Sequence, residues 1–430
     1  MKRIICFVLC LLLCGCAPPV QTGQTVAAPD TSGVAVVPIA PSFADSLAVT
    51  ERYTEPEDPE MRLAWRRDLV ESRMRQMMSM LWTPEQDIIY THAEEPQSLK
   101  AGRIYRGMPY AHGSGSGMSF LTFASGMDEK GVYTISGLEG ARMTGDINSA
   151  HISNDCADAV FWAWAAVSGS ISFGSTRRMT QFYGCVPVGE YVCNETSYSC
   201  ATTRIAEENG MECMYRSYAQ MQKADGMVWF TDGGQGHAVM ISSVHVVRNQ
   251  DGSINGNESY VLVLEQVSGN LAGEVSYYDE TIGQTVYIGC GVDNKMSFRA
   301  LYKIGCLPIT CKELIDPAPL AEECVSDSVE KLSEDTALTG VLESNYRISH
   351  VTMTIYDAQG NKVQQAIGYN LEQNMYQFKV SQLRGNSVIE INRGDVDLNK
   401  LPGGSYRCVL SCTVSTGRTL TVRDFTFTKE

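Results

Sequence analysis

The cysteine at position 156 has sequence neighbours that suit a thiol nucleophile. Cys156 stands in the segment Asn-Asp-Cys-Ala-Asp, where an apolar run with helical spacing begins, and Asn154 or Asp155 can cap that helix. At a helix N-terminus the macrodipole favours a thiolate. The N–H groups there can also hold the oxyanion of a tetrahedral intermediate. Cys156 is therefore the candidate nucleophile.

His237 is the candidate base for this thiol. It follows the glycine-rich segment 233–236 and begins an apolar run, 237–247, that predicts a strand. Such a loop is unusual before a core histidine, but it suits a histidine that must meet a helix N-terminus from another element. A base within reach would take the thiol proton and later protonate the leaving group.

Two residues compete to orient His237. Glu265 and Gln266 end the apolar run 260–267, which predicts the neighbouring strand. A slip of one residue in register exchanges the faces on which the two side chains lie. A carboxylate would hold the tautomer and stabilise imidazolium, whereas an amide would orient the ring without charge. Both alternatives stay open at this point.

The surrounding pattern predicts an α+β domain over 56–312. Residues 84–150 read as irregular and glycine-rich, with 113–117 as a loop near the site. The elements expected on periodicity are helices at 58–81, from 153 onward and in part of 203–222, then strands at 226–230, 237–247, 260–267 and 300–310. The sheet formed by these strands should be antiparallel.

The C-terminal third has a different texture. Charge-rich residues 313–336 predict a linker, and short alternating strands with frequent turn signals fill 337–430. This spacing of strands is typical of an immunoglobulin-like β-sandwich.

The N-terminus predicts export. Basic residues precede an apolar run of ten, 4–13, which is too short to span a bilayer. The following Cys-Gly-Cys resembles a bacterial lipobox, which implies a signal peptide at 1–16, lipidation of Cys16 and attachment to the outer side of a bacterial membrane. Ordinary signal cleavage is the alternative. Residues 17–55, rich in Pro, Ala, Thr, Ser and Gly, predict a flexible tether.

Composition argues against two classes of function. The chain has 430 residues and a formal net charge of -15, without a basic stripe, so nucleic acid is not an expected partner. No His-x-x-x-His or paired Cys-x-x-Cys spacing is present, so neither a metal site nor another cofactor is expected. Of the 15 cysteines, those outside the N-terminal segment other than Cys156 could form disulfides in an exported protein, but the sequence assigns no pair.

Four short motifs resemble the NlpC-type papain-like cysteine peptidases: Gly-Met-Pro-Tyr at 107–110, Asn-Asp-Cys-Ala-Asp at 154–158, Asp-Gly-Met-Val-Trp-Phe at 225–230 and Gly-His-Ala-Val-Met-Ile at 236–241. Glu-Gln at 265–266 is similar to the Glu-Gln-Asn of CHAP amidases. The resemblance implies cleavage of amide bonds, typically in peptidoglycan peptides, through a thioester. It assigns catalysis to Cys156, His237 and Glu265, and substrate contact to Tyr110, Asp155 and Gln266.

Two other functions fit the same residues. The domain could be a catalytically inactive surface module that binds or adheres. It could instead transfer the acyl group to an amine, as transglutaminases do. Reactivity of the thiol separates the first alternative from hydrolysis, and the identity of the products separates the second.

Overall fold

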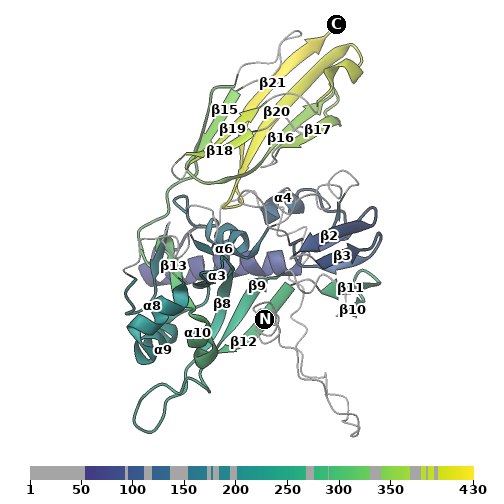
Figure 1. Cartoon of the computed structure of the whole chain (residues 1–430). Helices are drawn as coiled ribbons and strands as arrows, with labels where there is room; N and C mark the ends of the chain where they lie inside the picture. The colour runs from purple at the N-terminus through teal and green to yellow at the C-terminus, as the bar shows by residue number, and fades with distance from the viewer. Residues whose placement is uncertain are drawn as a thin grey trace, which may run out of the picture. The chain divides into compact units, whose positions relative to one another are not determined.

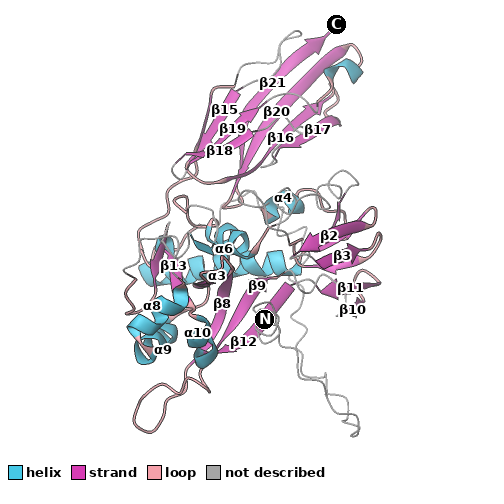
Figure 2. Ribbon diagram, viewed as in Figure 1, coloured by secondary structure: helices cyan, strands magenta, loops and turns pink. Residues whose placement is uncertain are grey.

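The structure is a computed structural model (Figures 1 and 2) that describes residues 54–92, 95–110, 119–135, 154–171, 176–177, 184–193, 201–267, 276–288, 290–329, 340–368, 379–383, 386–391 and 396–430. The expected signal peptide, Cys16, nearly all of the tether and the 113–117 loop lie outside these residues. Within the described part, no helix is long and apolar enough to cross a membrane.

Helix α3, Pro59–Ser79, is the long helix expected at 58–81. Asp58 caps it by accepting a 2.9 Å hydrogen bond from the amide of Met61, and Pro59 occupies the first turn, where its missing N–H costs nothing. Its buried methionines, Met74, Met77 and Met78, fill the core. These methionine side chains therefore serve as core packing.

A six-stranded antiparallel sheet lies against this helix. Its strands, in spatial order, are β12 (Cys290–Ser297), β9 (Tyr260–Gln266), β8 (Gly236–His245), β7 (Gly226–Phe230), β13 (Leu307–Cys311) and β6 (Cys185–Pro187). The strands predicted at 226–230, 237–247 and 260–267 are thereby confirmed, as is their antiparallel pairing. Helix α6, Cys156–Trp164, packs between α3 and β8.

The expectation of an irregular segment at 84–150 is wrong for its described parts. A second sheet takes two strands from them, β4 (Ile104–Arg106) and β5 (Val132–Ile135), and adds β1 (Leu81–Pro84), β11 (Gln284–Ile288) and β10 (Ser276–Asp279). The hairpin of β2 (Ile88–His92) and β3 (Glu95–Leu99) and the short helix α4 (Phe120–Ala124) also form there. Strands of three to five residues carry little periodicity, and the pairing of β4 with β11 is distant in sequence.

The strand predicted at 300–310 is also wrong in its first half. Residues Phe298–Ile304 form helix α10, and only Leu307–Cys311 are strand. The side chain of Ser297 caps the helix, and Gly305, at φ 72°, ends it in the left-handed conformation that glycine adopts readily. A short apolar run is ambiguous between the two structures, and these caps decide it. Helices α8 (Thr202–Asn209) and α9 (Met211–Gln220) confirm the helical part of 203–222.

The C-terminal part of the chain consists of two four-stranded antiparallel sheets. One contains β14 (Val325–Asp327), β15 (Gly340–Ser344), β19 (Asn386–Ile391) and β18 (Lys379–Leu383), and the other contains β17 (Lys362–Gly368), β16 (Ile348–Tyr356), β20 (Gly404–Val414) and β21 (Thr419–Lys429). They share one apolar core. We call residues 325–430 the C-terminal module. Helices with several sheets, followed by this all-antiparallel part, confirm the α+β class.

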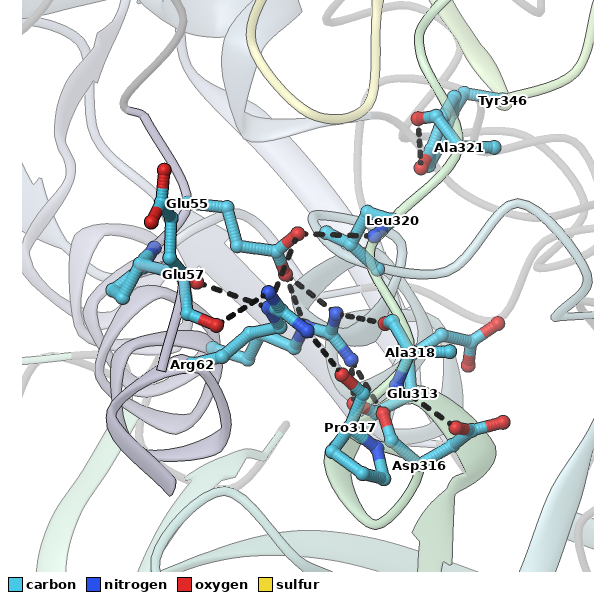
Figure 3. Close-up of polar contacts among 12 residues, drawn as sticks. Glu55, Glu57, Arg62, Glu313, Asp316, Pro317, Ala318, Leu320, Ala321 and Tyr346 are labelled. Carbon is cyan, nitrogen blue, oxygen red and sulfur yellow. Dashed lines mark hydrogen bonds and ion pairs between the residues drawn. The ribbon is translucent and has the colours of Figure 1, made fainter. Parts of the chain in front are cut away.

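The segment joining the two parts is held against α3 by polar contacts, among them the bond from the labelled Arg62 to the carbonyl of Pro317 (Figure 3). Arg66, fully buried, pairs with Glu55 and donates to the backbone carbonyls of Glu313, Asp316 and Ala318. Glu55 also accepts from the amide of Leu320. We call residues 313–324 the connector. The described residues of 47–430, connector included, belong to one compact unit.

Candidate active site

The nucleophile candidate lies in the first turn of α6, as expected. Asp155 is the N-cap, and its carboxylate accepts from the amides of Ala157 at 2.8 Å and Asp158 at 2.9 Å. Cys156 follows directly and is 3% exposed. At the other end of the helix, the Trp164 indole donates to the carbonyl of Ala224 at 2.8 Å, which ties α6 to the turn before β7. Cap and indole together fix where the sulfur lies.

His237 reaches this sulfur from the start of β8. In the loop before it, Gly234 has φ 86°, and Gly236 approaches Thr176 so closely that a Cβ would lie 2.2 Å from the hydroxyl oxygen. Only glycine fits at that approach. The imidazole hydrogen-bonds to the Cys156 side chain. The central geometric expectation, that residues 156 and 237 meet, is therefore met.

Register decides which polar residue of β9 faces the imidazole. Met240 pairs with Leu264 across β8 and β9, so Glu265 lies opposite Val239 and on the same face as His237, two residues away. The Glu265 carboxylate lies 2.9 Å from Nε2 of His237. Since Nε2 faces the carboxylate, Nδ1 is the ring nitrogen available to the sulfur. Glu265, and not Gln266, orients the ring.

The electrostatics of the site favour the imidazolium. Burial by itself lowers the pKa of His237, but the charge of Cys156 and the hydrogen bonds that the imidazolium makes to Cys156 and Glu265 raise it to about 10. Burial opposes ionisation of Glu265 too, and its bond to His237 outweighs that effect and lowers its pKa. The His237 and Glu265 side chains remain 21% and 17% exposed. The pair is thus shielded but reachable from solvent.

The three expected substrate-contacting residues lie close to the nucleophile, in positions that support the site. Gln266 is fully buried, and its amide donates to the carbonyl of Met108 at 2.6 Å. Tyr110 is buried and forms a backbone bridge with Asn154, next to the cap. Asp155 caps α6. In this conformation Gln266 and Tyr110 hold segment 107–110 against the start of the helix.

Sequence reasoning missed a fourth polar residue. Asn294 donates to the second oxygen of the Glu265 carboxylate at 2.5 Å. A bulge in β12 between Gly291 and Asn294 places it there, and Asp293, at φ 52°, is bound by Arg75 of α3 at 3.1 Å. The run Gly-Val-Asp-Asn carries no recognisable motif, because the bulge appears only once β12 pairs with β9.

An aromatic residue beside the imidazole was also missed. Trp229 pairs with His237 across β7 and β8, so both rings lie on one face, with centroids 6.5 Å apart. Its partly exposed indole forms a wall next to the catalytic candidates. The alternation of β7 could have indicated this face once the register was known.

Comparison with known proteins adds no assignment. No protein-family model matches the chain, and no curated protein matches it significantly. The chemistry of the site therefore rests on its geometry. A thiol at a helix N-terminus that contacts an imidazole, which in turn contacts a carboxylate, can form and break acyl–sulfur bonds.

Proposed function

We propose that the protein is a cysteine hydrolase that cleaves amide bonds. The observation that carries the proposal is the Cys156–His237–Glu265 chain of contacts, with the sulfur in the first turn of α6. Each contact meets a requirement of nucleophilic catalysis: an activated thiol, a base within reach and a group that orients the base.

The geometry supports a two-step reaction. The Cys156 thiolate attacks the substrate carbonyl carbon, a C–S bond forms, and the oxyanion lies near the Cys156 N–H, since the amides of Ala157 and Asp158 already donate to Asp155. The imidazolium of His237 gives its proton to the leaving nitrogen, and the C–N bond breaks. His237 then takes a proton from water, whose oxygen attacks the thioester. The C–S bond breaks, which releases a carboxylic acid and restores the Cys156 thiolate and the His237 imidazolium.

The proposed substrate and location are supported by sequence motifs. The order of Gly-Met-Pro-Tyr, Asn-Asp-Cys and Gly-His supports an NlpC- or CHAP-like papain-like domain that acts on peptidoglycan or another extracellular peptide. The lipobox-like Cys16 supports anchoring to the outer side of a bacterial membrane. Two antiparallel sheets around one core support an immunoglobulin-like type for the C-terminal module.

Digestion of purified wall fragments, with mass identification of the products, tests the proposal. Wild-type protein should release peptides with a new carboxylate and a new amine, whereas Cys156→Ala should release none while its thermal unfolding is unchanged. Cys324→Ala is the matched control, because this cysteine is exposed and lies in the connector. Equal turnover by Cys156→Ala and the wild type would refute the assignment.

Two further readings are separated by the same samples. A binding module would retain wall fragments without cleaving them, and its Cys156 would react with iodoacetamide no faster than Cys324. An acyl-transferring enzyme would form a new amide when a primary amine is added, instead of a free carboxylate. The partly solvent-exposed His237–Glu265 pair favours hydrolysis, since water can reach the thioester.

A further inference from the structure

The nucleophile helix carries a buried acidic residue that faces the C-terminal module. Asp158, two residues after Cys156, is 2% exposed. Arg347, between β15 and β16, is also buried and interacts electrostatically with Asp158. Its guanidinium lies 5.2 Å from the ring centroid of Trp162, one helical turn further along α6. A charge of the module is thus placed beside the first turn of the helix.

The module also contacts the end of this helix. The Ser415 hydroxyl, in the turn between β20 and β21, donates to the carbonyl of Ala165 at 2.6 Å. A carbonyl at the end of a helix has no partner within the helix, so this bond satisfies it. Just beyond, Gly169 lies so close to the module that a Cβ would be 2.2 Å from the Asn345 carbonyl oxygen. The last turn of α6 and the residues after it are therefore in contact with the module, and Asp158 in the first turn interacts electrostatically with it.

The connector is hydrogen-bonded both to α3 and to the module, so it does not act as a free linker between them (Figure 3). Arg66 binds its first half to α3. Tyr346 donates through its hydroxyl to the carbonyl of Ala321 at 2.9 Å, and Asn345 donates to the carbonyl of Glu322 at 2.8 Å. The residues that flank Arg347 in the chain are thereby fixed to the connector.

We propose that the C-terminal module is a working part of the active site, in which Arg347 is a positioning residue that holds α6 and places a positive charge beside its first turn, where Cys156 lies. The inference rests on the proposed function. Burial, and after it the neighbouring Asp155, raises the pKa of the Asp158 carboxyl well above its usual range, whereas the positive charge of Arg347 acts in the opposite direction. A positive charge beside the first turn also favours a thiolate at Cys156. Arg347 supplies positive charge to the same turn, as His237 does from β8.

Several titratable groups besides Arg347 contribute to the electrostatic environment of the active site. His237 and Glu265 face the sulfur of Cys156 from β8 and β9, while Asp155 and Asp158 share its helix. Helix α3 contributes Arg67, which is paired with Asp225, and Arg73, against which Gly417 of the module packs. Of these groups, Asp158 interacts electrostatically with Arg347.

The rate of Cys156 alkylation by iodoacetamide across pH tests the inference in the full chain. Arg347→Met keeps the aliphatic stem and removes the charge. We expect it to slow alkylation at pH 7 about tenfold, the effect of a shift of one pKa unit, and to move the rate profile to higher pH. Arg347→Lys, which restores the charge, should recover most of the rate. Arg407→Met is the control, since Arg407 pairs with Asp424 on an exposed strand of the same module.

Two milder variants keep the test decisive if Arg347→Met does not fold. Ser415→Ala removes one hydrogen bond at the end of α6, and Gly169→Ala forces the contact with Asn345 apart, and both should slow alkylation while Arg407→Met does not. Rates within twofold of wild type in all folded variants would overturn the inference alone. Wild-type Cys156 that reacts no faster than Cys324 would refute the proposed function and the inference with it.

Discussion

Glu265 determines the protonation state of the imidazole more than any other residue of β9. Its carboxylate is shared between His237 and Asn294, so its position is fixed from both sides. The pKa of His237, raised to about 10, means that the ring stays protonated through neutral pH while the thiol pair is intact. This is the state from which a proton can pass to a leaving amine.

Glu265→Gln should move the alkaline limb of activity to lower pH. In the wild type, the negative charge of Glu265 and its hydrogen bond to the ring both raise the pKa of His237. The variant removes the charge and weakens the hydrogen bond. The pKa of His237 therefore falls, and the imidazolium is lost at a lower pH. We expect hydrolysis at neutral pH to fall about 10²-fold. Rate profiles of hydrolysis and of iodoacetamide alkylation measure the shift. Exposed Glu258→Gln is the control, and an unmoved alkaline limb in Glu265→Gln would contradict the role of Glu265.

The elements of the site are placed by close approaches that only small residues permit. Gly236 lets β8 begin against Thr176, and Gly226 lies beneath the Trp164 ring, where a Cβ would be 2.9 Å from the indole. These contacts bring the start of β8 and the body of α6 to the distance at which imidazole and sulfur meet. Glycine is therefore required in this segment for close packing as well as for the turn geometry.

Gly236→Ala should reduce activity strongly while the fold survives. The new methyl group would meet the Thr176 hydroxyl, so the start of β8 and with it His237 must shift, and a displacement of about 1 Å can cost about 10²-fold in rate. Turnover and thermal unfolding are the measurements. Gly233→Ala is the matched control in the same loop, because its Cβ would lie 3.6 Å from Thr231 in ordinary contact. Equal activity of both variants would show that the approach of Gly236 is not needed.

At the scale of the molecule, Arg66 joins helix α3 and the residues just before it to the connector, which lies 250 residues further along the chain at Asp316. It lies on α3, pairs with Glu55 before that helix, and binds carbonyls of the connector beyond β13. Because the guanidinium is buried, these partners must supply all of its hydrogen bonds. The start of the described chain and the connector are therefore held to one helix.

Arg66→Ala should lower the free energy of unfolding by about 3–5 kcal/mol, because it leaves Glu55 and several carbonyls without their buried partner. Denaturant unfolding measures the loss. The control is Arg204→Ala, which breaks an exposed pair with Glu208 four residues away and should cost about 0.5 kcal/mol or less. A similar loss of unfolding free energy in both variants would show that the buried Arg66 contacts stabilise the protein no more than an exposed ion pair does.

Local signals were sufficient to single out Cys156 and His237 as candidates and to predict the elements on which they lie. The Asn-Asp-Cys start of α6, the glycine-rich approach to His237 and the apolar runs of β7, β8 and β9 are read from neighbours in the chain, because caps, turns and alternation act over a few residues. The second sheet, the choice of Glu265 over Gln266, the bulge that presents Asn294 and the contact of Arg347 with α6 depend on pairing between distant segments. Only the tertiary structure decided these, because register and long-range burial are set by the packing of the whole chain and leave no trace in a short window of sequence.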